Sequence, residues 1–300
     1  MKVVLAGGSG SLGRRLCPAL AERGHEPLVL TRSPRPDLPW RQVRWDGRTA
    51  GDWQRELTGA AVINLAGELV DRRATPQAID LLTRSRVEPT RALADAAASV
   101  DRPPPVWLQL STLAIYGDAG EQTLDERAEP AAGPPQMAGV ARAWESAAAG
   151  VRTDRQVILR TGIVLDRDAP ALGRLVGVTR WGLGGRIARG TQWVSWLHIA
   201  DFLSIALRAL EDDSMHGVVH ATAPEPVRNA ELMAELRRVL RRPPAPPTPA
   251  ALVRLGAVFL RTDPALALTG RRCVPTRLLA AGFQFQQPHL RGALEDLLGR

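Results

Sequence analysis

Three glycines near the start of the chain have the spacing of a phosphate-binding turn. Gly7, Gly10 and Gly13 follow the apolar run Val3–Leu5 and lead into a helical pattern that begins at Ser11. In a strand–loop–helix unit, the first glycine permits a tight turn, the second lets the backbone approach a pyrophosphate, and the third lets the helix lie on its strand. The N–H groups at the start of such a helix attract a phosphate. The pattern predicts dinucleotide binding rather than a purely structural turn.

The residues that end the second predicted strand indicate which dinucleotide would bind. An NAD-binding unit usually places an acid about 20 residues after the glycine loop, where it holds the ribose hydroxyls. Here Thr31, Arg32 and Ser33 occupy that place. Because a guanidinium forms charge-assisted hydrogen bonds with a phosphate, Arg32 favours NADP over NAD. The alternative is a solvated surface arginine, which is common in a chain so rich in arginine.

Two acids follow the predicted strand at 61–65, near the edge where ligands of open α/β sheets bind. Glu68 and Asp71 could transfer a proton there, or they could be solvated acids of a loop. His198 and Asp201 flank the start of another predicted helix. For this second pair we favour a structural role, because an aspartate suits the start of a helix.

Tryptophans and arginines supply further candidates. Trp181, Trp193 and Trp196 flank a glycine-rich segment, where they could line a substrate pocket or pack its floor. Arg86 and Arg160 could each bind an anion, although Arg86 could equally pair with an acid on a helix surface. No group of histidines and cysteines has the spacing of metal ligands, so we expect no metal site.

Alternating strands and helices must position these residues. Buried-strand patterns recur at 3–6, 27–31, 61–65, 106–110 and 156–160, and helical patterns occur at 11–23, 76–98, 137–149 and 202–210. This rhythm predicts an α/β fold with a Rossmann-like, doubly wound parallel sheet. We expect an NADP-binding domain over 1–165 and a smaller, mainly helical substrate-side domain over 166–300. A segment near 191–222 is expected to return to the main sheet.

Composition argues against several classes of protein. The net charge is +8, but Lys2 is the only lysine, and the arginines are dispersed singly or in pairs with no aromatic interleaving. We therefore expect no nucleic-acid partner. Two cysteines predict a reducing compartment. No stretch reaches the roughly 18 apolar residues of a membrane span, and the N-terminal apolar run is too short for a signal peptide. A cytoplasmic protein without a membrane partner is expected.

Several segments carry a resemblance to a known family. They are Ala6–Gly13, Val62–Glu68, Ser111–Gly117, Ser85–Val87, Trp144-Glu145, Leu159–Gly162, Gly182–Gly185, Ser195–His198 and Ala281–Phe285. The first three resemble the extended short-chain dehydrogenase/reductase superfamily. The others resemble its atypical "epimerase family" branch, whose members carry a C-terminal domain of unknown function and are often described as nucleotide-sugar epimerases.

The resemblance implies roles for individual residues. Arg32 and Ser33 would meet the 2′-phosphate of NADP, and Asp46 would lie near the adenine. Thr112 stands where the superfamily keeps its catalytic serine or threonine. The full set implied to contact the cofactor is Gly7, Gly10, Ser11, Leu12, Arg32, Ser33, Asp46, Leu65, Ala66, Gly67, Thr112 and Arg160.

The chain departs from the superfamily at the residues that transfer protons. There a tyrosine is the general acid/base, and a lysine four residues later lowers its pKa. The matching positions here are Met137 and Ala141, and the chain has no other lysine than Lys2 and no other tyrosine than Tyr116. An acid/base with a pKa suited to neutral pH is thus missing.

The remaining catalytic candidates are Thr112, Glu68 and Tyr116. The resemblance implies an NADP-dependent oxidoreductase or epimerase-type enzyme that acts on a small or sugar-like substrate, with a homodimer as its expected assembly. The missing Tyr/Lys pair keeps an alternative open. In that alternative the chain binds NADP without catalysis, as a regulatory or interaction protein, for example one linked to cell division.

Overall fold

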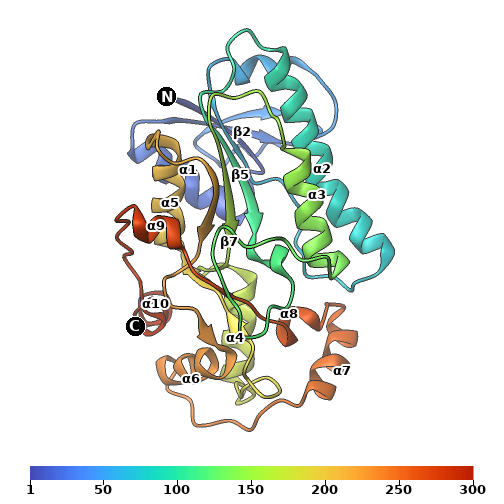
Figure 1. The fold of residues 1–300 in the computed structure, drawn as a ribbon, viewed down its shortest axis with the longest axis vertical. Helices are drawn as coiled ribbons and strands as arrows, with labels where there is room; N and C mark the ends of the chain where they lie inside the picture. The colour runs from blue at the N-terminus through green and yellow to red at the C-terminus, as the bar shows by residue number, and fades with distance from the viewer. Residues whose placement is uncertain (300) are drawn as a thin grey trace.

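A seven-stranded parallel sheet forms the centre of the molecule in the computed structural model, which describes residues 1–299 (Figure 1). The strands lie in the order β11-β7-β5-β4-β1-β2-β3. Their bounds are β1 (Lys2–Ala6), β2 (Glu26–Thr31), β3 (Arg41–Arg44), β4 (Ala61–Asn64), β5 (Trp107–Thr112), β7 (Gln156–Thr161) and β11 (Gly217–Ala221). The chain leaves β1 toward one edge through β2 and toward the other through β4, so the doubly wound α/β fold is confirmed.

Alternate residues of β1 fill two separate cores, because successive side chains of a strand point to opposite faces of the sheet. Val3 and Leu5 pack in one core with Leu16 of α1, whereas Val4 packs in the other with Leu93 of α2. The helices on the first face are α1 (Ser11–Glu22) and α5 (Ile199–Glu211); those on the second are α2 (Pro76–Ser99) and α3 (Val140–Ala147) (Figure 1).

Four elements of the N-terminal half differ from the expectation. β3 was not expected, because its residues Arg41–Arg44 are mostly polar; it lies at the edge of the sheet, where polar side chains are common. The 3₁₀-helices η1 (Asp52–Leu57) and η2 (Leu113–Tyr116) were also not expected. The helix predicted over 137–149 begins with a π-helical turn, η3 (Pro135–Gly139), before α3.

The C-terminal half contributes one strand to the main sheet and builds a third core beside it. β11 runs parallel to β7, with Val218 opposite Ile158. The third core contains Trp196 together with apolar residues of α4, α6 and α10. Because Trp196 is fully buried there, it packs the interior and does not line a pocket. The bounds of the three helices are α4 (Pro170–Arg180), α6 (Asn229–Val239) and α10 (Leu290–Leu298).

The remaining elements are short strand pairs and three more helices. The pairs are β8 (Ile163–Leu165) with β10 (Trp196–His198), β9 (Trp193–Val194) with β12 (Val227–Arg228), and β6 (Thr123–Leu124) with β13 (Arg272–Cys273). The helices are α7 (Ala250–Leu260), α8 (Ala265–Leu268) and α9 (Thr276–Ala280). Among residues 1–299, no helix has both the length and the apolar character that crossing a membrane requires.

The core assignment predicts a large loss of stability when a central strand loses a side chain. Leu5 is completely buried in β1, so Leu5→Ala should lower the free energy of unfolding by about 2–5 kcal/mol. Denaturant unfolding followed by circular dichroism measures this loss. Leu279→Ala is the matched control, because Leu279 is about half exposed on α9; its effect should stay near 0.5 kcal/mol or below. Equal losses in the two variants would contradict the assignment.

Candidate functional site

A cleft of about 1280 Å³ opens at the carboxyl ends of the central strands. It is lined by the glycine loop after β1, the end of β2, the segment after β4 and the start of α4. Of the twelve residues implied to contact a cofactor, ten line this cleft: Gly7, Gly10, Ser11, Leu12, Arg32, Ser33, Asp46, Leu65, Ala66 and Gly67. Thr112 and Arg160 are not among its lining residues.

The glycine loop has the geometry that its sequence predicts. Gly7 has a φ of +78°, and a Cβ on it would lie 2.8 Å from the backbone carbonyl of Leu65. A Cβ on Gly13 would lie 2.4 Å from Gly8 Cα, so any side chain there would push α1 away from the loop. Gly10 precedes α1 with no side-chain cap, and no acid occupies the first turn. The first N–H groups of α1 are therefore available to an anion.

Charged side chains surround the end of β2. The Arg32 side chain is 76% exposed, and its Nη2 lies 3.8 Å from Oε1 of Glu68. Asp46 accepts hydrogen bonds from the hydroxyl and backbone N–H of Thr49 and from the backbone N–H of Arg48. These bonds, with the Thr49 hydroxyl first, lower the pKa of Asp46 to about 2. The cleft thus offers an exposed cation and a hydrogen-bonded carboxylate within one region.

The segment after β4 is held by a buried arginine. Arg86 donates from Nη2 to the carbonyl of Glu68 at 2.9 Å and lies over the ring of Trp144. Burial lowers the pKa of Arg86 to about 10. Among the described residues Arg86 has no ion-pair partner, so the alternative of a surface pair with an acid is wrong. The Glu68 carboxylate instead accepts from Arg72 at 3.1 Å.

Asp71 is not a solvated loop acid. Its carboxylate binds Arg174 of α4 and accepts a hydrogen bond from the hydroxyl of Thr262, which follows α7. The Arg174 contact is the main reason that the pKa of Asp71 lies below its usual value. Arg73 also donates to the carbonyl of Val258 in α7. The segment Glu68–Arg73 therefore contacts the cleft on one side and two C-terminal helices on the other.

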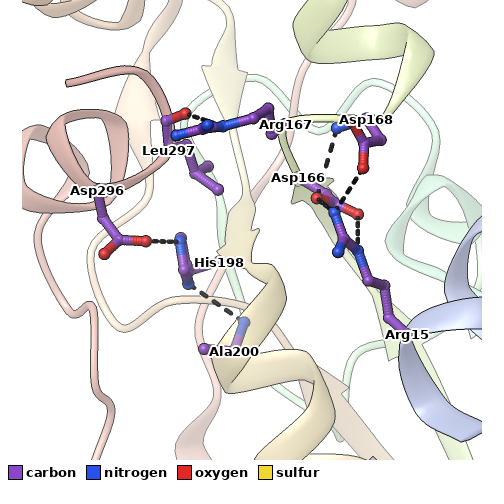
Figure 2. A network of polar contacts seen from close by, with 8 residues as sticks. All are labelled: Arg15, Asp166, Arg167, Asp168, His198, Ala200, Asp296 and Leu297. Atoms are coloured by element: carbon purple, nitrogen blue, oxygen red, sulfur yellow. Dashed lines mark hydrogen bonds and ion pairs between the residues drawn. The ribbon is translucent and has the colours of Figure 1, made fainter. Parts of the chain in front are cut away.

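A second group of ion pairs joins α1 to the segment after β8 (Figure 2), and its residues Arg15, Asp166 and Asp168 line the cleft. Arg15 of α1 forms two hydrogen bonds with Asp166, at 2.7 and 2.9 Å, and one with Asp168 at 2.8 Å. The neighbouring Arg167 donates to the carbonyl of Leu297 in α10. Sequence reasoning missed Arg15, Asp166 and Asp168, although Asp166 directly follows β8, at a strand's carboxyl end.

The structural role expected for His198 and Asp201 agrees with their contacts. His198 Nδ1 accepts from the backbone N–H of Ala200 at the start of α5, and its Nε2 lies 3.2 Å from Asp296 (Figure 2). Asp201 is fully buried and accepts from the backbone N–H groups of Gln286 and Gln287. Neither residue is among those lining the cleft.

Tyr116 and Arg160 belong to a buried hydrogen-bond network with His220 and Glu145. The Tyr116 hydroxyl is 2.7 Å from Arg160 Nη1 and 2.6 Å from His220 Nε2. Arg160 forms a double hydrogen bond with Glu145, at 2.8 and 2.9 Å, and Glu145 also accepts from Ser111. Burial raises the pKa of Tyr116 to about 12 and lowers that of His220 to about 4. The structure therefore gives Tyr116 and Arg160 protein partners, not places in the cleft.

The positions near β5 where the superfamily keeps its catalytic residues hold either a hydroxyl that is already hydrogen-bonded or an apolar side chain. The Thr112 hydroxyl accepts from the backbone N–H of Ala114 at 3.2 Å, which caps the short helix η2. Met137 belongs to the π-helical turn η3, and Ala141 is buried in α3. Glu68 is thus the one of the three catalytic candidates that lines the cleft, with a third of its side chain exposed.

Comparison with known proteins identifies relatives of this chain. Residues 3–138 match the model of the NAD dependent epimerase/dehydratase family, and residues 248–297 match a domain of unknown function, DUF1731. The chain is 35% identical to the epimerase family protein SDR39U1 of Bos taurus, over 99% of this chain and all of that protein.

Two solved structures show the same likeness. The crystal structure of human SDR39U1 with NADPH is 33% identical, covers 99% of both chains and superposes with a TM-score of 0.88. A nucleoside-diphosphate sugar epimerase from Corynebacterium glutamicum is 29% identical with a TM-score of 0.79, over all of this chain and 58% of that chain.

The buried ion pair between Arg160 and Glu145 predicts a large loss of stability when one partner is removed. Glu145→Gln leaves the Arg160 guanidinium buried without a carboxylate, so the free energy of unfolding should fall by about 3–5 kcal/mol. The same substitution at Glu121, whose pair with Arg228 is exposed, is the control and should change stability little. Thermal and denaturant unfolding of both variants test this. A mild effect at Glu145 would show that the pair is not needed by the fold.

Proposed function

We propose, because this chain belongs to the NAD-dependent epimerase/dehydratase family, that it is an NADP(H)-dependent oxidoreductase or epimerase-type enzyme for a small or sugar-like substrate. One observation carries the proposal. An uncapped helix N-terminus and the cationic side chain of Arg32 face the same cleft at the carboxyl ends of the parallel strands. A dinucleotide with three phosphates suits this combination.

The lining residues fit the parts of NADP(H). The backbone N–H groups at the start of α1, from Ser11 and Leu12, would bind the pyrophosphate. Arg32 and Ser33 would bind the 2′-phosphate, and Asp46 would accept a hydrogen bond near the adenine. Gly7 leaves no side chain between the loop and β4. When bound, NADP(H) supplies or accepts a hydride.

Proton transfer in this proposal falls to Glu68. It lines the cleft, and its two carboxylate oxygens face two arginines, Arg32 and Arg72. Tyr116 is less suited, because its hydroxyl is already bound and its raised pKa opposes ionisation. The Thr112 hydroxyl accepts from the N–H of Ala114 and keeps its own O–H, which would donate a hydrogen bond to the substrate.

A non-catalytic NADP(H)-binding protein is the second candidate. The positions that match the tyrosine and lysine of the superfamily hold Met137 and Ala141, and Ala141 is packed in the interior. In this reading the cofactor would stabilise one conformation for a regulatory or interaction role. Turnover assays separate the two candidates.

The division of labour follows the halves of the chain. We assign cofactor binding to residues 1–165 and the substrate side to residues 166–300, with the segment near 191–222 joining the main sheet through β11. A cytoplasmic location and a homodimer remain predictions from sequence.

The first test is cofactor preference. NADPH should bind more tightly than NADH by about 1.5–3 kcal/mol, or roughly 10- to 150-fold, which is typical of hydrogen bonds to a charged group. Arg32→Asp should abolish or invert that preference. Isothermal titration calorimetry with both cofactors gives the ratio.

Arg102→Asp is the control for the cofactor test. Arg102 is exposed between α2 and the start of β5, at the opposite end of the strand from the cleft, so its loss changes the net charge equally without touching the proposed phosphate site. It should leave the ratio unchanged. Equal affinity of the unchanged protein for NADPH and NADH would refute the assignment of Arg32.

The second test is turnover of simple carbonyl compounds. Without the Tyr/Lys pair, reduction of generic ketones and aldehydes by NADPH should run about 10²–10⁴-fold below that of enzymes that keep the pair. Residual turnover should fall further in Glu68→Gln but not in Asp80→Asn, a second carboxylate that lines the same cleft. Steady-state assays at 340 nm measure both. Rapid turnover that survives both Glu68→Gln and Thr112→Ala would show that neither residue is catalytic.

A further inference from the structure

Two helices of the C-terminal half expose large apolar side chains. On and just after α4 these are Val178, Trp181 and Leu183, and Trp181 is 85% exposed. On α7 they are Leu252, Leu255, Val258 and Phe259, and Phe259 is 78% exposed. We call these seven residues the apolar surface. Exposed aromatic groups gathered in this way are typical of a ligand or partner surface.

The apolar surface is linked to the cofactor cleft through the segment Leu69–Asp71, although none of its seven residues lines the cleft itself. Leu69 lines the cleft and is itself 64% exposed. Asp71 then binds both Arg174 of α4 and Thr262 at the end of α7. The surface is therefore continuous in the fold with the segment that carries Glu68.

One face of α4 points toward that segment. Arg174, Val178 and Trp181 are spaced i, i+4 and i+7, so they lie along one side of the helix. Arg174 reaches Asp71 from this side. The other side of α4 is fixed by Leu172 and Val176, which are buried in the third core. Val178 and Trp181 consequently lie along the Asp71 side of the helix.

The charge around the apolar surface is mainly positive, and Asp71 is the acid that binds between α4 and the end of α7. The chain has 31 acidic residues, yet none occurs in 169–200 or in 236–262, the two segments that supply the surface. These segments hold ten arginines. Within residues 1–299, Arg180, Arg254 and Arg261 are exposed and take part in no ion pair. The two segments are joined by a bridge between Ile187 and Thr248.

This pairing of charge and apolar area selects the occupant. A second copy of the chain would bring arginines against arginines, and like charges in contact are unfavourable. A neutral sugar would leave the exposed tryptophan and phenylalanine uncovered. An anion with a large apolar body satisfies both features.

We propose that the apolar surface, with its arginines, is the substrate-recognition site for an amphipathic anion: an aromatic or aliphatic body that carries a carboxylate, sulfonate or phosphate. The inference rests on the proposed function, since the cofactor cleft beside the surface would present NADP(H) to that substrate. Within the proposed function it favours a small molecule that is more apolar than a sugar.

The test uses the full chain saturated with NADPH and the probe 1-anilinonaphthalene-8-sulfonate, whose fluorescence rises on apolar contact. Saturation with NADPH keeps the probe out of the cofactor cleft. Trp181→Ser and Phe259→Ser should each weaken probe binding about tenfold, the effect expected from losing contact with one large apolar side chain. Leu279→Ser, which removes a half-exposed leucine elsewhere, is the matched control and should have no effect.

A second arm tests the charge. Arg180→Ala and Arg254→Ala should each weaken binding of the sulfonate probe about threefold and reduce its salt dependence. They should not affect the uncharged probe N-phenyl-1-naphthylamine. Arg102→Ala, which removes an exposed arginine between α2 and the start of β5, is the control and should leave both probes unchanged.

Three outcomes would overturn the inference. The first is that the Trp181→Ser and Phe259→Ser variants bind the sulfonate probe as tightly as the unchanged protein does. The second is that the arginine variants affect both probes equally. The third is that the protein sediments with phosphatidylserine vesicles and Trp181→Ser abolishes this sedimentation, which would indicate a membrane surface. NADPH titration of the same variants separates the two proposals. If NADPH fails to bind the unchanged protein, the proposed function fails; if it binds all variants equally while the probe results fail, only this inference does.

Discussion

The close approach of the glycine loop to the end of β4 makes the cleft possible. A Cβ on Gly7 would lie against the carbonyl of Leu65, and one on Gly13 would collide with Gly8. Only a backbone without side chains at these points lets α1 begin directly at the sheet edge, with its N–H groups pointing into the cleft. Because of this contact, the charged residues after β2 and after β4, Arg32 and Glu68, line the same cleft.

The segment Glu68–Arg73 joins the two halves of the molecule. Arg86 donates a hydrogen bond to the backbone carbonyl of Glu68, while the Asp71 carboxylate contacts α4 and the residue after the end of α7. Among the described residues Arg86 forms no ion pair, but the Glu68 carboxylate is near enough to oppose the effect of burial on the pKa of Arg86. The same contacts place the C-terminal helices beside the region where chemistry would occur.

The polar groups in the interior near β5 bind one another and do not form a catalytic pair. Glu145, Arg160, Tyr116 and His220 satisfy one another in a buried network. Such a network is costly to disrupt, and it keeps Tyr116 and Arg160 away from the cleft. Of the three catalytic candidates, Glu68 alone lines the cleft.

The sequence by itself determined the sheet, the glycine loop and the place of Arg32, because strand and helix periodicity and the glycine spacing are local properties. The edge strand β3 escaped this reasoning because its side chains are polar. The tertiary structure alone decided which charges meet. Arg15 and Asp166 are 151 positions apart, Asp71 and Thr262 are 191 apart, and Tyr116 and His220 are 104 apart. Such pairs depend on how helices pack across the sheet, so no local pattern marks them, and only the fold shows that Tyr116 is buried while Glu68 faces the cleft.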